Sequence, residues 1–147
     1  MARVSRSAVV PYSAQQMFDL INDIQSYPEF MTGCVGAEVL ESSEECVQAK
    51  LTLGLAGIHQ SFVTRNELLP PNQMKMHLVD GPFSRFEGIW SFDDAPEGQT
   101  QAGCKVGLEL DFAFSNPLLG MTVGRMIEDV ASQQVDALCQ RAEKVYA

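Results

Sequence analysis

Residues 104–114 read CKVGLELDFAF, and Asn116-Pro117 opens the last segment of the chain. The first stretch alternates apolar with polar or small side chains, which predicts a strand with one buried and one wet face. Asn116 is a favourable helix N-cap and Pro117 suits the first helical position, so a long helix is expected to follow over roughly thirty residues. A half-buried strand that leads into a long amphipathic helix indicates an α+β fold.

The period of two extends upstream from this strand and predicts a meander of antiparallel strands. Turn signals separate the strands: a polar cluster at residues 41–45, Pro70-Pro71-Asn72, and Asp80-Gly81-Pro82-Phe83. A polar hairpin tip, residues 93–103, precedes the last strand. The expected strands are residues 35–40, 46–53, 58–69, 74–79, 85–92 and 104–114.

The beginning of the chain predicts one strand and two short helices. Residues 3–10 have the pattern of a strand. Ser13 and Gln16 match a capping box, and apolar residues then recur at helical spacing, which predicts a helix that ends near Gln25. Residues 27–31 permit one more short helical turn. We therefore expect a curved antiparallel sheet wrapped around the long C-terminal helix.

Composition limits the class of protein. A chain of 147 residues is expected to form a single domain, residues 1–147. Ten Lys and Arg against 19 Asp and Glu give a net charge of −9, which argues against attachment to nucleic acid through phosphate neutralisation alone and against a DNA partner. No apolar stretch is long enough for a membrane span or a signal peptide, so we expect a cytoplasmic protein without integral membrane association. The four widely spaced cysteines are expected to be reduced.

A long helix held away from a strongly curved sheet leaves an apolar space, which is where small apolar ligands bind. Aromatic and methionine side chains are expected to line it, because they form adaptable apolar walls. Thr64, Gln60 and Trp90 are candidate hydrogen-bond donors to a polar head group, and Phe83 is a candidate gate. The predicted ligand-binding residues are Phe62, Thr64, Phe83, Phe86, Trp90, Leu110, Phe112, Met121, Met126, Ile127 and Val130.

The sequence contains no recognisable metal-binding, catalytic or phosphate-binding motif. His59 and His77 are the only histidines, and neither has a metal-ligand spacing with Cys, Asp or Glu. No nucleophile-and-base signature and no phosphate-binding loop occur, so we expect no catalytic residues, no metal and no required cofactor.

Lys50 and Lys105 are both expected on solvent-exposed strand faces, where they could form a small basic patch that contacts ribosomal RNA.

Several motifs resemble the START-like (SRPBCC, helix-grip) superfamily. They are Val10-Pro11-Tyr12-Ser13, Tyr27-Pro28-Glu29-Phe30, Asp80-Gly81-Pro82-Phe83 and residues 88–92, followed by the C-terminal helix. Gly33-Cys34, Thr64-Arg65-Asn66 and residues 141–146 look particularly like the bacterial group that joins the coenzyme Q-binding START-domain proteins to the ribosome association toxin RatA. The order and spacing of these motifs carry the resemblance over nearly the whole chain.

The resemblance implies a helix-grip fold and no enzymatic chemistry in the nearest relatives, although aromatases and cyclases occur elsewhere in the superfamily. It implies two functions. The first hypothesis is a RatA-like protein that binds the large ribosomal subunit and blocks subunit association, with an antitoxin protein as a further partner. The alternative is a carrier of ubiquinone or another prenyl lipid that supports respiration through the same cavity. The density of matching motifs favours the first hypothesis.

Overall fold

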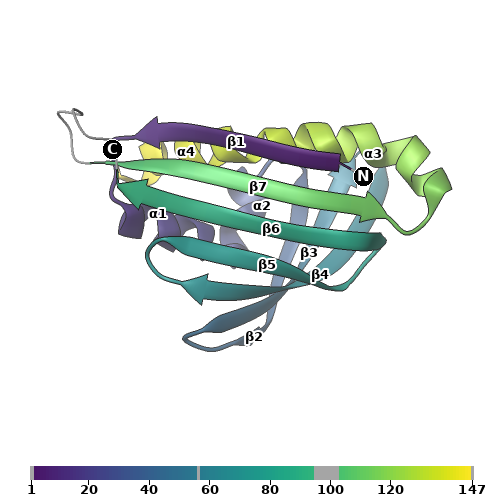
Figure 1. Ribbon diagram of the computed structural model, residues 1–147, viewed down its shortest axis with the longest axis horizontal. Helices are drawn as coiled ribbons and strands as arrows, with labels where there is room; N and C mark the ends of the chain where they lie inside the picture. The colour runs from purple at the N-terminus through teal and green to yellow at the C-terminus, as the bar shows by residue number, and fades with distance from the viewer. Residues whose placement is uncertain (1, 56, 95–102, 147) are drawn as a thin grey trace.

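A seven-stranded antiparallel sheet in the order β1-β7-β6-β5-β4-β3-β2 forms the centre of the structure, a computed structural model that describes residues 2–55, 57–94 and 103–146. The sheet curls around the helices, and α3 and α4 run alongside β1 and β7 (Figure 1). The elements in chain order are β1 (Ala2–Val10), α1 (Ala14–Ile21), η1 (Ile24–Ser26), α2 (Tyr27–Phe30), β2 (Cys34–Ser42), β3 (Cys46–Leu55), β4 (Ile58–Leu69), β5 (Gln73–Asp80), β6 (Phe83–Asp94), β7 (Cys104–Phe114), α3 (Pro117–Ser132) and α4 (Gln134–Tyr146).

The alternation predicted for the last strand is confirmed in β7. Its inward side chains from Cys104 to Phe112 are buried, whereas Lys105 and Glu109 on the other face are exposed. Each fully buried aliphatic or aromatic side chain stabilises the fold by about 1.5–3 kcal/mol. The concave face of the sheet is therefore the apolar side of the molecule, and the convex face is wet.

The connection between β1 and β2 lies over the concave face, because these two strands form opposite edges of the sheet. The predicted capping box begins this connection: Ser13 Oγ accepts from the Gln16 amide at 3.1 Å, and Gln16 Oε1 accepts from the Ser13 amide at 2.9 Å. The predicted cap of α3 is also confirmed, since Asn116 Oδ1 accepts from the Leu118 amide at 2.9 Å.

None of the helices in the described part of the chain is long and apolar enough to cross a membrane.

The first helix is shorter than the sequence predicts. It ends at Ile21 rather than near Gln25, and a 3-10 turn and the short helix α2 follow it. In a continuing helix the Gln25 amide would donate to the Ile21 carbonyl. The Tyr27 hydroxyl donates to that carbonyl instead. The helix already ends one turn earlier, where the Asp23 amide donates to the Leu20 carbonyl, and the side chain of Tyr27 satisfies the free carbonyl of Ile21.

The predicted long C-terminal helix is confirmed in its extent, but it is interrupted at Gln133, which separates α3 from α4. The Gln134 side-chain amide donates to the Val130 carbonyl at 2.9 Å, which is the acceptor that the Gln134 backbone would use in a continuous helix. The same side chain donates to the Thr32 carbonyl at 2.9 Å. Gln134 therefore interrupts the helix and ties the junction to the segment before β2.

Two strand boundaries also differ from the prediction. β6 starts at Phe83 instead of residue 85, so Phe83 belongs to the sheet and not to the turn. Gly81 has a φ of 152°, and a Cβ at this position would lie 2.6 Å from Phe62 Cβ, which explains a glycine in this turn. The expected hairpin tip at residues 93–103 falls mostly outside the described residues.

We expect Tyr27→Phe to destabilise the fold by about 1–3 kcal/mol, because the substitution leaves the buried Ile21 carbonyl without its partner. Urea unfolding followed by circular dichroism measures this change in the free energy of unfolding. Tyr12→Phe is the matched control, since the Tyr12 hydroxyl has no hydrogen-bond partner among the described residues. Equal stability of the two variants would contradict the role assigned to Tyr27.

Candidate ligand-binding site

A cavity of about 110 Å³ lies between the concave face of the sheet and the helices. Strands β3 to β7 supply most of its wall, and the segment from η1 to the start of β2 and the α3–α4 junction supply the rest. The lining residues are Ile24, Tyr27, Met31, Thr32, Cys34, Ala49, Leu51, Leu53, Phe62, Thr64, Asn66, Met76, Phe83, Phe86, Trp90, Leu108, Leu110, Phe112, Ile127, Val130, Ala131 and Gln134.

The predicted ligand-binding residues all lie on this wall except Met121 and Met126. Met121 is 85% exposed on α3, and Met126 is half-buried without reaching the cavity. The first turns of α3 leave both Leu118 and Met121 in solvent. Ligand binding by the residues on the wall stays a prediction.

Aromatic rings gather around Phe83 at one part of the wall. Its ring centroid lies 5.5 Å from that of Phe62, 5.2 Å from that of Phe86 and 6.0 Å from that of Phe112. Edge-on and tilted contacts of this kind stabilise a cluster beyond simple burial. Phe83 is only 6% exposed, so the structure shows it as a packed wall residue, and its role as a gate stays a prediction.

The inward face of β4 carries a buried polar pair. Thr64 and Asn66 are 2% and 4% exposed, and Thr64 Oγ1 donates to Asn66 Oδ1 at 2.9 Å. The opposite face carries Arg65, whose Nε lies 3.3 Å from Cys46 Sγ on the exposed side of the sheet. The predicted inward direction of Thr64 is therefore confirmed, whereas Gln60 does not line the cavity.

Polar lining residues were missing from the predicted site, among them Tyr27, Thr32, Asn66 and Gln134. Asn66 carried a usable signal, because it shares the strand parity of Phe62 and Thr64. Tyr27 and Gln134 carried no such signal, since each reaches the cavity only as a result of a helix interruption. Sequence periodicity assumes an unbroken helix and therefore misplaces the side chains at its end.

The wall of the cavity is uncharged: among the described residues, no Asp, Glu, Lys, Arg or His lines it. Burial raises the pKa of the Cys34 thiol and that of the Tyr27 hydroxyl, so both groups stay protonated near neutral pH. A charged ligand would lose its hydration here without gaining an ion pair. The site therefore suits an uncharged molecule.

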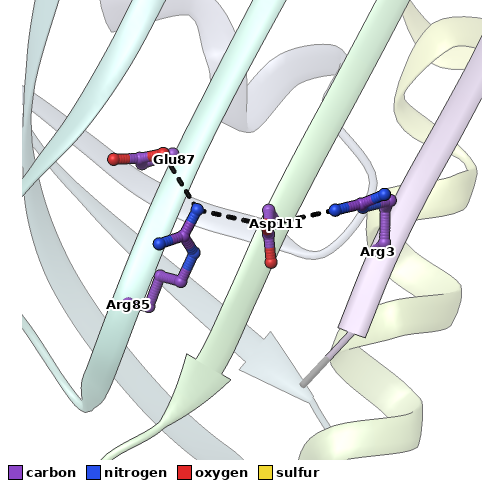
Figure 2. A network of polar contacts seen from close by, with 4 residues as sticks. All are labelled: Arg3, Arg85, Glu87 and Asp111. Carbon is purple, nitrogen blue, oxygen red and sulfur yellow. Dashed lines mark hydrogen bonds and ion pairs between the residues drawn. The ribbon is translucent and has the colours of Figure 1, made fainter.

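The convex face of the sheet pairs its charges. Asp111 on β7 lies 3.3 Å from Arg85 on β6 and 3.8 Å from Arg3 on β1, and Arg85 also contacts Glu87 at 3.3 Å (Figure 2). Such exposed ion pairs contribute about 0–1 kcal/mol each. Their importance here is that Arg3 and Arg85 are already matched by carboxylates.

The basic patch suggested by the sequence does not form. Lys50 lies on β3 and Lys105 on β7, separated along the sheet by four strand spacings of about 4.8 Å each. The register places Lys50 opposite Glu38 and Lys105 opposite Asp93. No group of three or more His, Cys, Asp or Glu side chains that could hold a metal ion occurs within residues 2–55, 57–94 and 103–146.

The family described as polyketide cyclase/dehydrase and lipid transport matches residues 10–139. The chain belongs to this family. Within the family it is 42% identical over 147 residues to the ribosome association toxin RatA of Escherichia coli, which covers the whole chain and 90% of that protein. It is 44% identical over 146 residues to the RatA protein of Vibrio cholerae, with 99% of each chain covered.

A more distant relative of the chain bears another name. The mitochondrial coenzyme Q-binding protein COQ10 homolog B of Xenopus laevis is 26% identical over 143 residues, which are 97% of this chain and 58% of that protein. Neither the RatA proteins nor this homologue is named as an enzyme.

Solved structures support the same fold. A START superfamily protein from Mycobacterium smegmatis has a TM-score of 0.68 at 23% identity and covers 97% of this chain and 98% of its own. The Zhui aromatase/cyclase from a Streptomyces species has a TM-score of 0.72 at 16% identity and covers 97% and 94%. The α+β helix-grip (START-like) fold expected from the sequence is thereby confirmed.

We expect iodoacetamide to label Cys34 at least about tenfold more slowly than Cys46 at pH 8, because Cys34 is buried on the cavity wall and its pKa is raised. The rate for Cys34 should increase through the ordinary thiol pKa of about 8.5 and continue to rise above it. Mass spectrometry of peptides after timed labelling measures both rates in one sample. Comparable rates would mean that the cavity is open to solvent.

Proposed function

We propose that this protein acts as a ribosome association factor of the RatA type, which binds the large ribosomal subunit and prevents it from joining the small subunit. The observation that carries the proposal is identity of 42% over the whole chain with a RatA protein. The proposal places the protein in the cytoplasm, where ribosomal subunits assemble and join.

An acidic protein suits a protein surface of the ribosome better than bare RNA. The net charge is −9, and the basic residues Arg3 and Arg85 on the convex face are matched by carboxylates. Phosphate neutralisation requires free basic groups, whereas an acidic surface complements a basic protein surface. We therefore propose contact mainly with ribosomal proteins.

The first test is a rejoining assay with separated ribosomal subunits. A molar excess of the purified protein should reduce the peak of joined ribosomes in a sucrose gradient, and immunoblotting should find the protein in the large-subunit fractions. Heat-unfolded protein at the same concentration serves as the control. Normal joining with the protein at the top of the gradient would refute the ribosome proposal.

The cavity favours a second, compatible function, the binding of an uncharged hydrophobic ligand such as a quinone or another prenyl lipid. Its wall is apolar apart from a few polar groups, and a more distant relative is named as coenzyme Q-binding. Its volume of about 110 Å³ is below the roughly 150 Å³ of an apolar cavity that accepts benzene and below the roughly 300–1,000 Å³ of most ligand pockets. A prenylated quinone would therefore bind only with an outward shift of α3 or of wall side chains.

Both proposed functions are non-enzymatic. A general acid or base has to reach a reacting group, and the cavity wall carries no charged or imidazole side chain among the described residues. Binding without a chemical step is the activity that such a wall supports.

We expect a short-chain ubiquinone analogue to quench the fluorescence of Trp90, the single tryptophan, because its indole lines the cavity. Val130→Phe should weaken this binding about tenfold or more by filling the cavity from α3. Val145→Phe is the matched control, since Val145 is exposed on α4 away from the cavity. Absence of saturable quenching in the unmodified protein would count against the quinone proposal.

A further inference from the structure

Two polar side chains are buried in a wall that is otherwise apolar. Apart from Cys, Tyr and Trp, Thr64 and Asn66 are the only polar residues that are buried in the described part of the chain. Both line the cavity from the inward face of β4, next to Phe62 on the same face. A leucine or valine would fill either position at lower cost in desolvation, so the pair requires an explanation beyond packing.

The hydrogen bonds of this pair are incomplete. Thr64 Oγ1 donates to Asn66 Oδ1 at 2.9 Å, which uses the carbonyl of the amide and fixes its orientation. Asn66 Nδ2 carries two N–H donors and has no hydrogen-bond partner among the described residues. The amide therefore presents unused donors to the cavity that it lines.

A second donor faces the same space. The indole N–H of Trp90 has no hydrogen-bond partner within the described ranges, although Trp90 is buried and lines the cavity. The amide of Gln134 is different, because both of its N–H groups already donate to the carbonyls of Val130 and Thr32. The N–H donors of Asn66 and Trp90 are thus available on the wall, and a ligand that carries an acceptor complements them.

The remaining features of the wall define the ligand further. It is uncharged along its described length, which excludes a carboxylate or phosphate head group. The rings of Phe62, Phe83 and Phe86, with centroids 5.2–5.5 Å apart, offer edges and faces to a flat molecule. The cavity volume of about 110 Å³ favours a compact group, and a ring would enter with the outward shift of α3 or of wall side chains described above.

We propose that Asn66, oriented by Thr64, donates a hydrogen bond to the carbonyl oxygen of a compact, uncharged ring-shaped ligand that binds in the cavity. The inference rests on the second proposed function, the binding of a hydrophobic ligand, and specifies the head group and its anchor. Asn66 contacts the ligand, and Thr64 is a positioning residue that holds the amide with its donors toward the cavity.

The test uses two probes of nearly identical shape. Acetophenone carries a carbonyl oxygen where α-methylstyrene carries a methylene group, so only the first accepts a hydrogen bond. We expect acetophenone to bind the unmodified protein about tenfold more tightly, which corresponds to about 1.4 kcal/mol. Titration followed by NMR of ¹⁵N-labelled protein measures both affinities. The side-chain NH₂ signals of Asn66 should shift downfield with acetophenone only.

Substitutions separate a binding role from a structural one. Asn66→Leu should abolish the preference for acetophenone, because it removes the amide that donates to the carbonyl oxygen. If Asn66 had only a structural role, the preference would persist in the folded variant. Thr64→Val should reduce the preference by freeing the amide to rotate. Thr52→Val is the matched control: Thr52 Oγ1 lies 2.8 Å from Ser61 Oγ in an exposed hydroxyl pair, and the preference should persist.

The outcomes distinguish this inference from the hydrophobic-ligand function on which it rests. Equal affinity for the two probes, with no shift of the Asn66 signals, would overturn the inference and leave the hydrophobic-ligand function intact. Failure of both probes to bind the unmodified protein would overturn the inference and the hydrophobic-ligand function together. Subunit joining in the presence of Asn66→Leu reports on the ribosome function separately. The comparison of probes in the unmodified protein decides the inference even if a variant fails to fold.

Discussion

The apolar concave face of the curved sheet is the constraint on which the rest of the structure depends. Seven strands direct their inward side chains to one side, and that side has to be covered. The β1–β2 connection and the two C-terminal helices cover it, with α3 and α4 alongside β1 and β7 (Figure 1). Where this cover is incomplete, an apolar cavity remains, and it is the proposed ligand-binding site.

The sequence correctly predicted the features that depend on local periodicity and on local capping residues. Alternation in residues 104–114 determined which side chains of β7 face inward, and the caps at Ser13 and Asn116 placed the starts of two helices correctly. It failed at the ends of helices, where long-range contacts decide. No sequence pattern near Gln25 predicts that the Tyr27 hydroxyl donates a hydrogen bond to the Ile21 carbonyl. The position of Met121 was misjudged for a related reason, because apolar character alone does not say which turn of a helix has a partner.

The proposed ribosomal function and the cavity use different parts of the molecule. The cavity is internal and uncharged, whereas contact with a ribosomal subunit requires the outer surface, whose charges are partly paired with one another. Kinship with RatA proteins and the coenzyme Q-binding homologue is consistent with one fold that serves both uses, because a fold does not by itself determine function. We therefore expect substitutions on the cavity wall to leave the proposed ribosomal contact unchanged.

The interruptions of the two helices have a consequence for how the cavity can evolve. Tyr27 and Gln134 each take a backbone carbonyl from a helix, and both also line the cavity. The helix interruptions thus form one boundary of the cavity, and the sheet forms the other. A change in the chemistry of the ligand needs only a new side chain on the sheet, whereas a larger ligand also needs a shift of α3 or of wall side chains. Different parts of the cavity wall therefore determine which ligand chemistry and which ligand size the cavity accepts.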